Sequence, residues 1–172
     1  MKPRLYILVL AIALPVCLYA AAIVYEGGQG AGAAPAGKPA AAAHFTAEAS
    51  GLQWTPLFLG LERAVVSGDP AKPGVPFVIR LRANKGAQVP AHYHPVDENM
   101  TVLAGTLRLG TGDMYDAKAL HAMTAGSYSF MPANLRHFGR FAPGTVVQIH
   151  GVGPFTITFV NPADDPRTAA TK

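Results

Sequence analysis

Short runs in which large apolar residues occupy every second position recur along the chain from residue 77 onward. Because successive side chains of a strand point to opposite faces, each run predicts a half-buried strand. Glycine and proline, 18 and 15 of the 172 residues, bound the runs as turn formers do. The apolar members are Phe77, Ile79 and Leu81; Leu107 and Leu109; Tyr128 and Phe130; and Ile157 and Phe159.

The spacing of these runs predicts about nine strands and hence an all-β domain. Only residues 113–122 have a composition that favours a helical turn. Two architectures fit this periodicity, a closed barrel and an immunoglobulin-like sandwich. The pattern of alternation is the same for both architectures and does not distinguish them.

The N-terminus has the composition of an export signal or a membrane anchor. Lys2 and Arg4 precede residues 5–25, which carry no charge. A basic start, an apolar stretch and small residues such as Ala20-Ala21-Ala22 are typical of a signal peptide, although the stretch is also long enough to span a bilayer. Both alternatives predict an exported protein that is periplasmic or anchored facing the periplasm, with membrane contact only through this segment.

Composition divides the remainder of the chain. Residues 26–44 are almost wholly glycine, alanine and proline and predict a linker. Aromatic and β-branched residues begin at position 45, so residues 45–166 are expected to form one folded domain and residues 167–172 a flexible tail.

Charge and cysteine content exclude several kinds of function. The chain has 14 basic residues, and without Lys2 and Arg4 the other 12 face 10 acidic residues. That near-neutral balance gives no electrostatic basis for binding nucleic acid. The single cysteine, Cys17, lies in the apolar N-terminal stretch, so the domain has no thiol for a disulfide or a cysteine metal site.

One stretch, residues 86–105, carries residues suited to metal chemistry. His92 and His94 are two positions apart, so on an extended strand both imidazoles project from one face. Glu98 follows after a turn at Pro95, which allows the next strand to return a carboxylate to the same face. His137, after a second turn, is a fourth candidate. Nitrogen and carboxylate donors on one face are what a divalent transition metal requires.

These residues match the two sequence motifs of the cupin superfamily. The first motif requires Gly, two His, Glu and Gly at fixed spacing, and Gly86, His92, His94, Glu98 and Gly105 fill every position. The chain resembles small, single-domain exported bacterial cupins in particular.

The second motif is matched less completely, by Gly126, Pro132 and His137. Asn134 stands where glycine is usual, which is a mild change because asparagine tolerates the left-handed conformation. Phe141 replaces the usual asparagine, which should make the wall of the site there more apolar.

The resemblance implies a single jelly-roll β-barrel (RmlC-like) and a site for a divalent transition metal. By position, the implied ligands are His92, His94, Glu98 and His137, and the metals usual in the superfamily are iron, manganese, nickel, zinc and copper. Asp97 should point to the opposite face from Glu98 and is not expected to be a ligand. His44 and His121 are expected at the surface.

Gln148 and His150 share one face of a predicted strand, and they are the candidate catalytic residues if that face is the lumen. The alternative for His150 is a hydrogen-bonded residue at a strand end. Met100, Val102, Tyr128, Phe130, Phe138 and Phe141 are expected to line a pocket or to fill the core.

Two function classes remain open at this point. The first is a metal-dependent enzyme, of the oxygenase type, acting on a small organic substrate. The second is a non-catalytic module that binds a metal or a small ligand outside the cytoplasm. Cupins also commonly form homodimers, in which an N-terminal arm containing Trp54 would lie against the second subunit.

Overall fold

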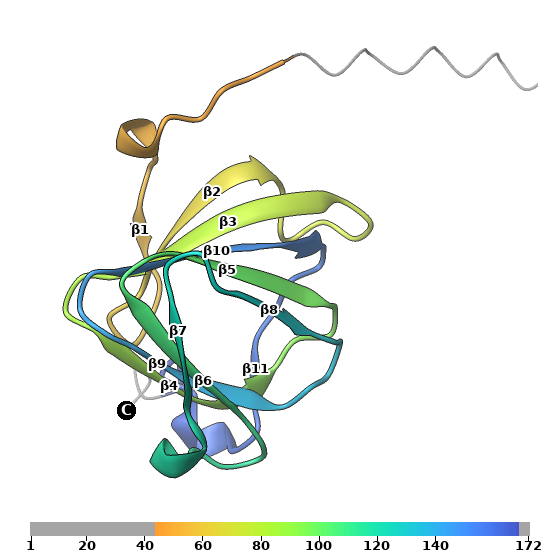
Figure 1. Cartoon of the computed structure of the whole chain (residues 1–172). Coiled ribbons are helices and arrows are strands. Elements are labelled where there is room, and N and C mark those ends of the chain that lie inside the picture. Colours follow the sequence, from red (N-terminus) through yellow and green to blue (C-terminus); the bar gives the residue numbers. More distant parts are fainter. Residues whose placement is uncertain (1–43, 169–172) are drawn as a thin grey trace, which may run out of the picture. The chain divides into compact units, whose positions relative to one another are not determined.

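The computed structural model describes residues 44–168, and these form an all-β domain (Figure 1). The apolar stretch, the linker to residue 43 and residues 169–172 lie outside the described residues. No helix of the described part has the length and apolarity needed to cross a bilayer. The strands are β1 (Thr55–Pro56), β2 (Glu62–Gly68), β3 (Pro76–Ala83), β4 (Ala87–Tyr93), β5 (Glu98–Ala104), β6 (Thr106–Thr111), β7 (His121–Thr124), β8 (Tyr128–Met131), β9 (His137–Phe141), β10 (Thr145–Val152) and β11 (Thr158–Phe159).

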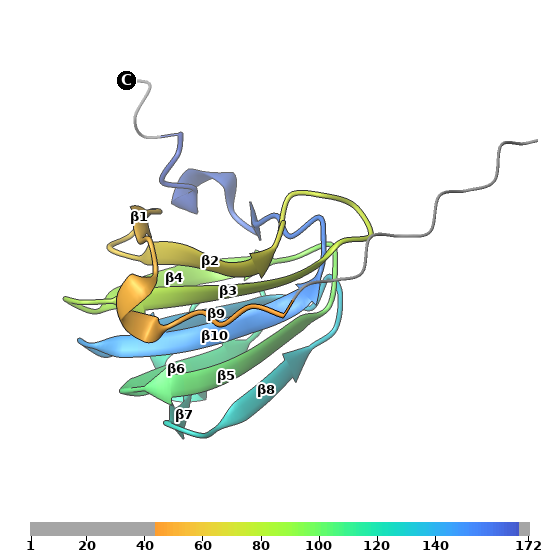
Figure 2. The ribbon, with the colours of Figure 1, turned by 90° about the horizontal axis from the view of Figure 1, so that it is seen from above.

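The strands form two antiparallel sheets, one lying over the other (Figure 2). One sheet has the order β1-β2-β3-β10-β5-β8, and the other has the order β11-β4-β9-β6-β7. From β3 onward the chain changes sheet at every connection except the one between β6 and β7. An immunoglobulin-like sandwich keeps several consecutive strand pairs within one sheet. The alternation is that of a jelly roll, so the sandwich alternative is wrong.

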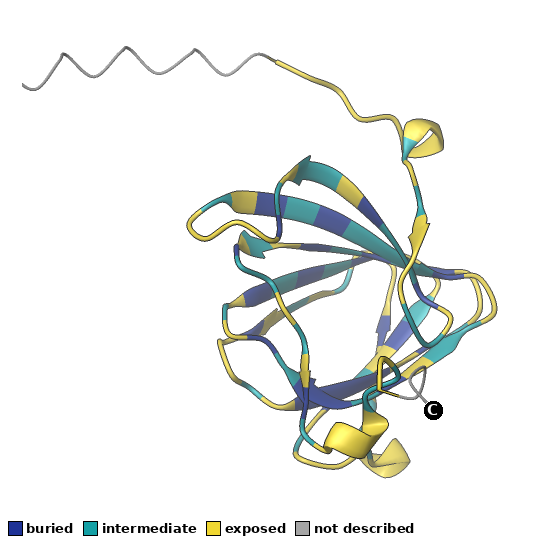
Figure 3. Cartoon of the chain, turned by 180° about the vertical axis from the view of Figure 1, so that it is seen from behind, coloured by how far each residue is buried: buried dark blue, intermediate teal, exposed yellow. Residues whose placement is uncertain are grey.

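The core lies between the sheets, where inward-facing side chains of the strands are buried or partly buried (Figure 3). On β3, for example, Phe77 and Ile79 are both 2% exposed. Burying each such side chain contributes about 1.5–3 kcal/mol to folding. The other core residues include Val89, Met100, Val102, Leu107, Phe141, Val147 and Ile149.

Two glycines of the first motif hold turns that no other residue fits well. Gly105 joins β5 to β6 at a φ of 73°. A Cβ there would lie 2.7 Å from Thr145, whose hydroxyl donates to the Thr106 carbonyl oxygen. Gly86 joins β3 to β4 at a φ of 83°, and its Cβ would lie 3.1 Å from the Phe141 carbonyl oxygen. The motif glycines therefore close the connections that bring the ligand-bearing strands together.

The edge strand β8 departs from expectation. Tyr128 and Phe130 are 56% and 51% exposed, so they lie on the outer face rather than in a pocket. Their register explains this: Ser129 pairs with Met100 and Met131 pairs with Glu98, and both partners face inward. Phe138 is buried, against Tyr115 at a centroid distance of 5.3 Å.

Three short 3-10 turns complete the described chain: η1 (Ala49–Gly51), η2 (Ala117–Ala119) and η3 (Pro162–Asp164). The second confirms the helical turn expected within residues 113–122. Near the N-terminal end, the Trp54 ring lies 4.3 Å from the Arg82 guanidinium of its own chain. Near the C-terminal end, the guanidinium of Arg167, a residue assigned from sequence to the tail, donates two hydrogen bonds to the Asp165 carboxylate.

Candidate metal centre

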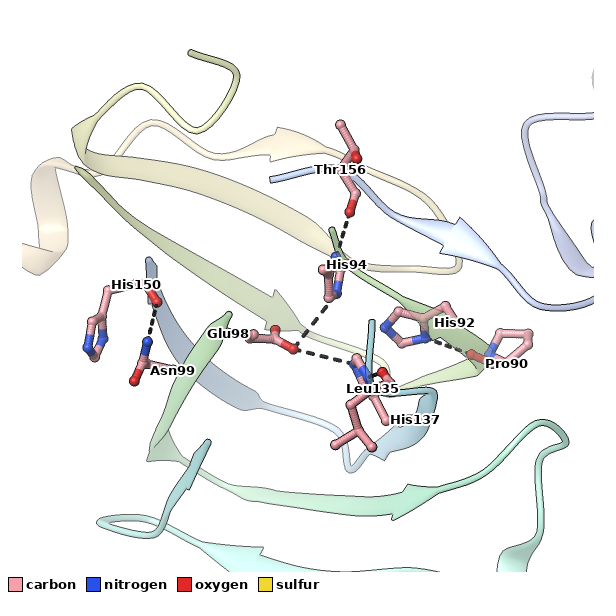
Figure 4. A network of polar contacts seen from close by, with 9 residues as sticks. All are labelled: Pro90, His92, His94, Glu98, Asn99, Leu135, His137, His150 and Thr156. Carbon is pink, nitrogen blue, oxygen red and sulfur yellow. Dashed lines mark hydrogen bonds and ion pairs between the residues drawn. The ribbon is translucent and has the colours of Figure 1, made fainter. Parts of the chain in front are cut away.

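Three strands bring four titratable side chains to one point inside the barrel (Figure 4). His92 lies on β4 and pairs in register with His137, the first residue of β9. His94 lies just beyond the end of β4, and Glu98 begins β5. All four are buried, with exposures of 7% for His92 and His94 and 2% for Glu98 and His137. The four residues expected to come together do so.

Each imidazole is fixed by a hydrogen bond from Nδ1 to a backbone carbonyl oxygen. His92 donates to Pro90 at 2.7 Å, and His94 donates to Thr156 at 2.7 Å. His137 donates to Leu135 at 3.0 Å. Because a carbonyl only accepts, Nδ1 carries the proton and Nε2 keeps its lone pair. All three rings are therefore in the tautomer that binds a metal through Nε2.

The free nitrogens converge on the carboxylate. One ligand nitrogen from each of the three histidines lies within 4.8 Å of the other two. Oε2 of Glu98 lies 3.4 Å from Nε2 of His137 and 3.7 Å from Nε2 of His94. Metal–ligand bonds of about 2.1 Å place neighbouring ligand atoms about 3 Å apart. The spacing of the four donors is close to what one ion would require.

Oε2 of Glu98 is an unsatisfied buried oxygen. Among the described residues it is the one buried side-chain polar atom without a hydrogen-bond partner. Leaving such a group unpaired costs about 1–3 kcal/mol, and more when it is charged. A cation between Glu98 and the histidines would satisfy that oxygen and all three Nε2 lone pairs. The residues present therefore fit a divalent metal.

Burial keeps His92 and His94 neutral. Desolvation, together with the nearby rings of His137 and His94, lowers the pKa of His92 to about 2. Desolvation also lowers the pKa of His94, despite the opposing effect of Glu98. Metal ligation requires deprotonated imidazole. At neutral pH a proton would compete little with a metal for these two residues.

The turn between β8 and β9 positions His137. Asp97 Oδ1 accepts a hydrogen bond from the Ala133 N–H at 2.8 Å, and the Asn134 N–H donates to the His94 carbonyl oxygen at 2.8 Å. Asn134 has a φ of 66°, which confirms that asparagine supplies the left-handed conformation at this position. Asp97 thus points away from the cluster, as expected, and ties the turn to β5.

A cavity of about 110 Å³ adjoins the cluster. Its walls are mostly apolar and include Phe141 and Phe155. The expected apolar effect of Phe141 is thereby confirmed. Apart from the four cluster residues, Arg63 is the one ionisable side chain in the described lining.

Gln148 and His150 do not face the lumen, so the expectation that their shared face is the lumen, on which their catalytic roles depended, is wrong. On β10 the inward residues are Thr145, Val147 and Ile149, which are all buried. Gln148 instead accepts a hydrogen bond from Arg80 Nε at 3.1 Å on the outer face. His150 is exposed, and Figure 4 shows its ring apart from the cluster. His44 and His121 are exposed, as expected.

The sequence did not indicate that Phe155 and Thr156, which follow β10, or Arg63 on β2 belong to the site. Phe155 stacks on His94, with centroids 4.1 Å apart, and the Thr156 carbonyl oxygen fixes the same ring. Neither belongs to either of the two cupin motifs, and Thr156 lies 62 positions after His94. Arg63 carried no signal beyond being a charged residue in an alternating strand.

Solved structures share this fold. An RmlC-like cupin from Shewanella frigidimarina has a TM-score of 0.51 at 16% identity, over 64% of this chain and 93% of that one. The polyketide cyclase RemF from Streptomyces resistomycificus has a TM-score of 0.60 at 13% identity, over 76% and 94%. A candidate acetylacetone dioxygenase from Methylibium petroleiphilum has a TM-score of 0.54 at 18% identity, over 73% and 86%.

No family model matches the sequence, and no curated protein matches it. At identities below 20%, these likenesses show that the chain has the cupin fold. They carry no activity over to it, because function belongs to the site and not to the fold.

Proposed function

We propose that this domain is a metal-dependent enzyme of the oxygenase type that acts on a small organic substrate. The observation that carries the proposal is the juxtaposition of the four donors with an adjoining apolar cavity. A purely structural metal would need no cavity beside it. His92, His94, Glu98 and His137 would hold the ion, and the bound metal would supply Lewis acidity or redox chemistry at its open positions.

The cavity lining favours a reaction that needs no separate acid or base from the protein. Its ionisable residues in the described chain are the four proposed ligands and Arg63. An arginine stays protonated at physiological pH and is a poor general base. Proton abstraction by a free carboxylate or histidine is therefore not available there, whereas reaction of oxygen with a held substrate needs chiefly open metal positions. The apolar wall would hold the substrate and exclude water.

The same lining supports a second candidate, a non-catalytic module that binds a metal or a small ligand. Such a module also needs a metal, a cavity and no acid or base. The proposed location serves either candidate: residues 5–25 would direct the domain to the periplasm or anchor it facing the periplasm. The expected homodimer stays a prediction.

Elemental analysis of the full-length protein isolated from its native compartment tests the metal proposal. We expect about one equivalent of a transition metal, lost in His92→Ala, His94→Ala and His137→Ala and kept in the surface control His121→Ala. Unchanged metal content in the three cluster variants would overturn the proposal. Fractionation tests location, and protein found only in the cytosol would contradict export.

Mass spectrometry of small molecules released from the same sample separates the two candidates. Consumption of the released compound in air, together with oxygen uptake, would support the enzyme. A compound that stays unchanged in the presence of the metal-loaded protein and air would favour the binding module.

A further inference from the structure

The side chain of Arg63 faces the lumen from strand β2. Arg63 pairs in register with Leu81, and residues directly opposite in antiparallel strands project to the same face. Leu81 and Arg63 both line the cavity beside the histidine cluster. The backbone of Arg63 is held in turn by β1, because the Thr55 hydroxyl donates to its carbonyl oxygen at 3.1 Å.

Arg63 has no acidic partner among the described residues. The neighbouring carboxylate, Glu62, is engaged by Arg82 at 2.7 Å and by Asn84 at 2.7 Å. Within residues 44–168, the other ion pairs of acidic residues with lysine or arginine are Lys72–Asp69, Arg136–Asp113 and Arg167–Asp165. Arg63 is a half-buried residue at an apolar cavity without a counter-ion from the described chain, and its guanidinium is a group that an anionic ligand would satisfy.

The chemistry of the guanidinium defines that ligand further. Its planar fork of N–H donors matches a carboxylate, which it binds through two parallel hydrogen bonds. The rest of the wall offers apolar contact, so the remainder of the ligand should be hydrocarbon. The cavity of about 110 Å³ has room for roughly four water molecules, which favours a short or small branched ligand.

We infer that the site takes a small aliphatic carboxylic acid and that Arg63 anchors its carboxylate. This inference rests on the proposed function, and it names the substrate class of the same site. Arg63 thereby determines specificity, since a neutral analogue of the same shape would leave the guanidinium unpaired. The anchored acid would lie with its hydrocarbon part against the apolar wall that adjoins the histidine cluster.

Calorimetric titration of the full-length, Zn²⁺-loaded protein tests this without relying on turnover. The probes are the acids from propanoate to hexanoate, 3-methylbutanoate and the matching neutral amides. We expect at least one acid to bind about ten- to a hundred-fold more tightly than its amide, as charge-assisted hydrogen bonds require. Arg63→Gln should bring acid and amide to similar affinity, and Arg63→Lys should keep part of the preference.

Arg80→Gln is the matched control, because Arg80 lies on the next strand but contacts Gln148 on the outer face. It should keep the full preference for the acid. The inference is overturned if no acid in the series binds, if acid and amide bind equally to the unmodified protein, or if Arg63→Gln keeps the preference. Retained Zn²⁺ in Arg63→Gln would separate failure of this inference from failure of the metal site.

Discussion

The ring of Phe155 lies almost flat against the imidazole of His94, with centroids 4.1 Å apart and planes inclined by 19°. The next residue, Thr156, accepts the hydrogen bond from Nδ1 of the same imidazole. One short segment after β10 thus fixes both the plane of the ring and its tautomer. Phe155 also contacts Phe77 in the core, at a centroid distance of 5.1 Å, so the segment links the proposed metal site to the packing of the barrel.

Replacing this ring should weaken both the fold and the site. We expect Phe155→Ala to lower the free energy of unfolding by about 2 kcal/mol, through lost burial and stacking. Metal affinity should fall about ten-fold, because the plane of His94 is no longer held. Urea unfolding and metal titration measure the two effects. Phe130→Ala is the control: that ring is 51% exposed on β8, and its loss should change neither quantity appreciably.

The unsatisfied oxygen of Glu98 leads to a prediction in which one substitution has opposite effects on two properties. Glu98→Gln removes a potential buried negative charge, so the metal-free protein should become more stable by about 1 kcal/mol. The same change removes a proposed ligand, so metal affinity should fall strongly. Thermal unfolding with and without metal separates the effects.

Asp97→Asn, which leaves the cluster intact, should not reduce metal content. A Glu98→Gln protein that keeps full metal affinity would show that the carboxylate is not a ligand.

The fold and the cluster could be predicted from sequence because they depend on local constraints. Gly86 and Gly105 adopt positive φ and carry the turns of the first motif. The two-residue spacing of His92 and His94 places both on one face wherever this segment is extended. Asn134 supports the left-handed conformation that its motif position requires.

The inward face of an individual strand could not be predicted in the same way. A period of two shows which residues share a face, but not which face is the interior. On β10 the choice is made by partners: Ile149 pairs with Met100, and both are buried, which leaves His150 outside. Arg63 and Phe155 were missed for a related reason, since they reach the site through pairing and packing far from either motif.

Replacing one member of a like-charge pair on the outer face of the second sheet should make the protein more stable. Arg108 and Arg140 lie directly opposite each other on β6 and β9, both exposed, and no described ion pair involves either. Like charges at such positions are destabilising. Arg108→Glu should therefore raise the free energy of unfolding by about 0.5 kcal/mol at low salt, and less at high salt.

Urea unfolding at two salt concentrations measures this gain. Arg108→Gln, which removes the repulsion without adding attraction, should give a smaller gain. The double variant Arg108→Glu/Arg140→Glu restores a like-charge pair and should lose the benefit. If the gain in stability persists in the double variant, or does not depend on salt, relief of charge repulsion is not its cause.

Burial of neutral histidine should make the metal-free protein sensitive to acid. Burial lowers the pKa of His92 to about 2, whereas the unfolded chain has a histidine pKa of about 6.5. Between those values the unfolded state binds the additional proton, so stability rises with pH and is lost as the pH falls below about 6.5. The lowered pKa of His94 acts in the same direction. For His92 alone, the loss between pH 7.5 and 5.5 should be about 1 kcal/mol or more. Urea unfolding of chelator-treated protein at the two pH values measures it. His92→Gln should reduce this loss of stability, while the exposed control His121→Gln should leave it unchanged. Equal stability of the unmodified protein at the two pH values would contradict the neutral burial of His92.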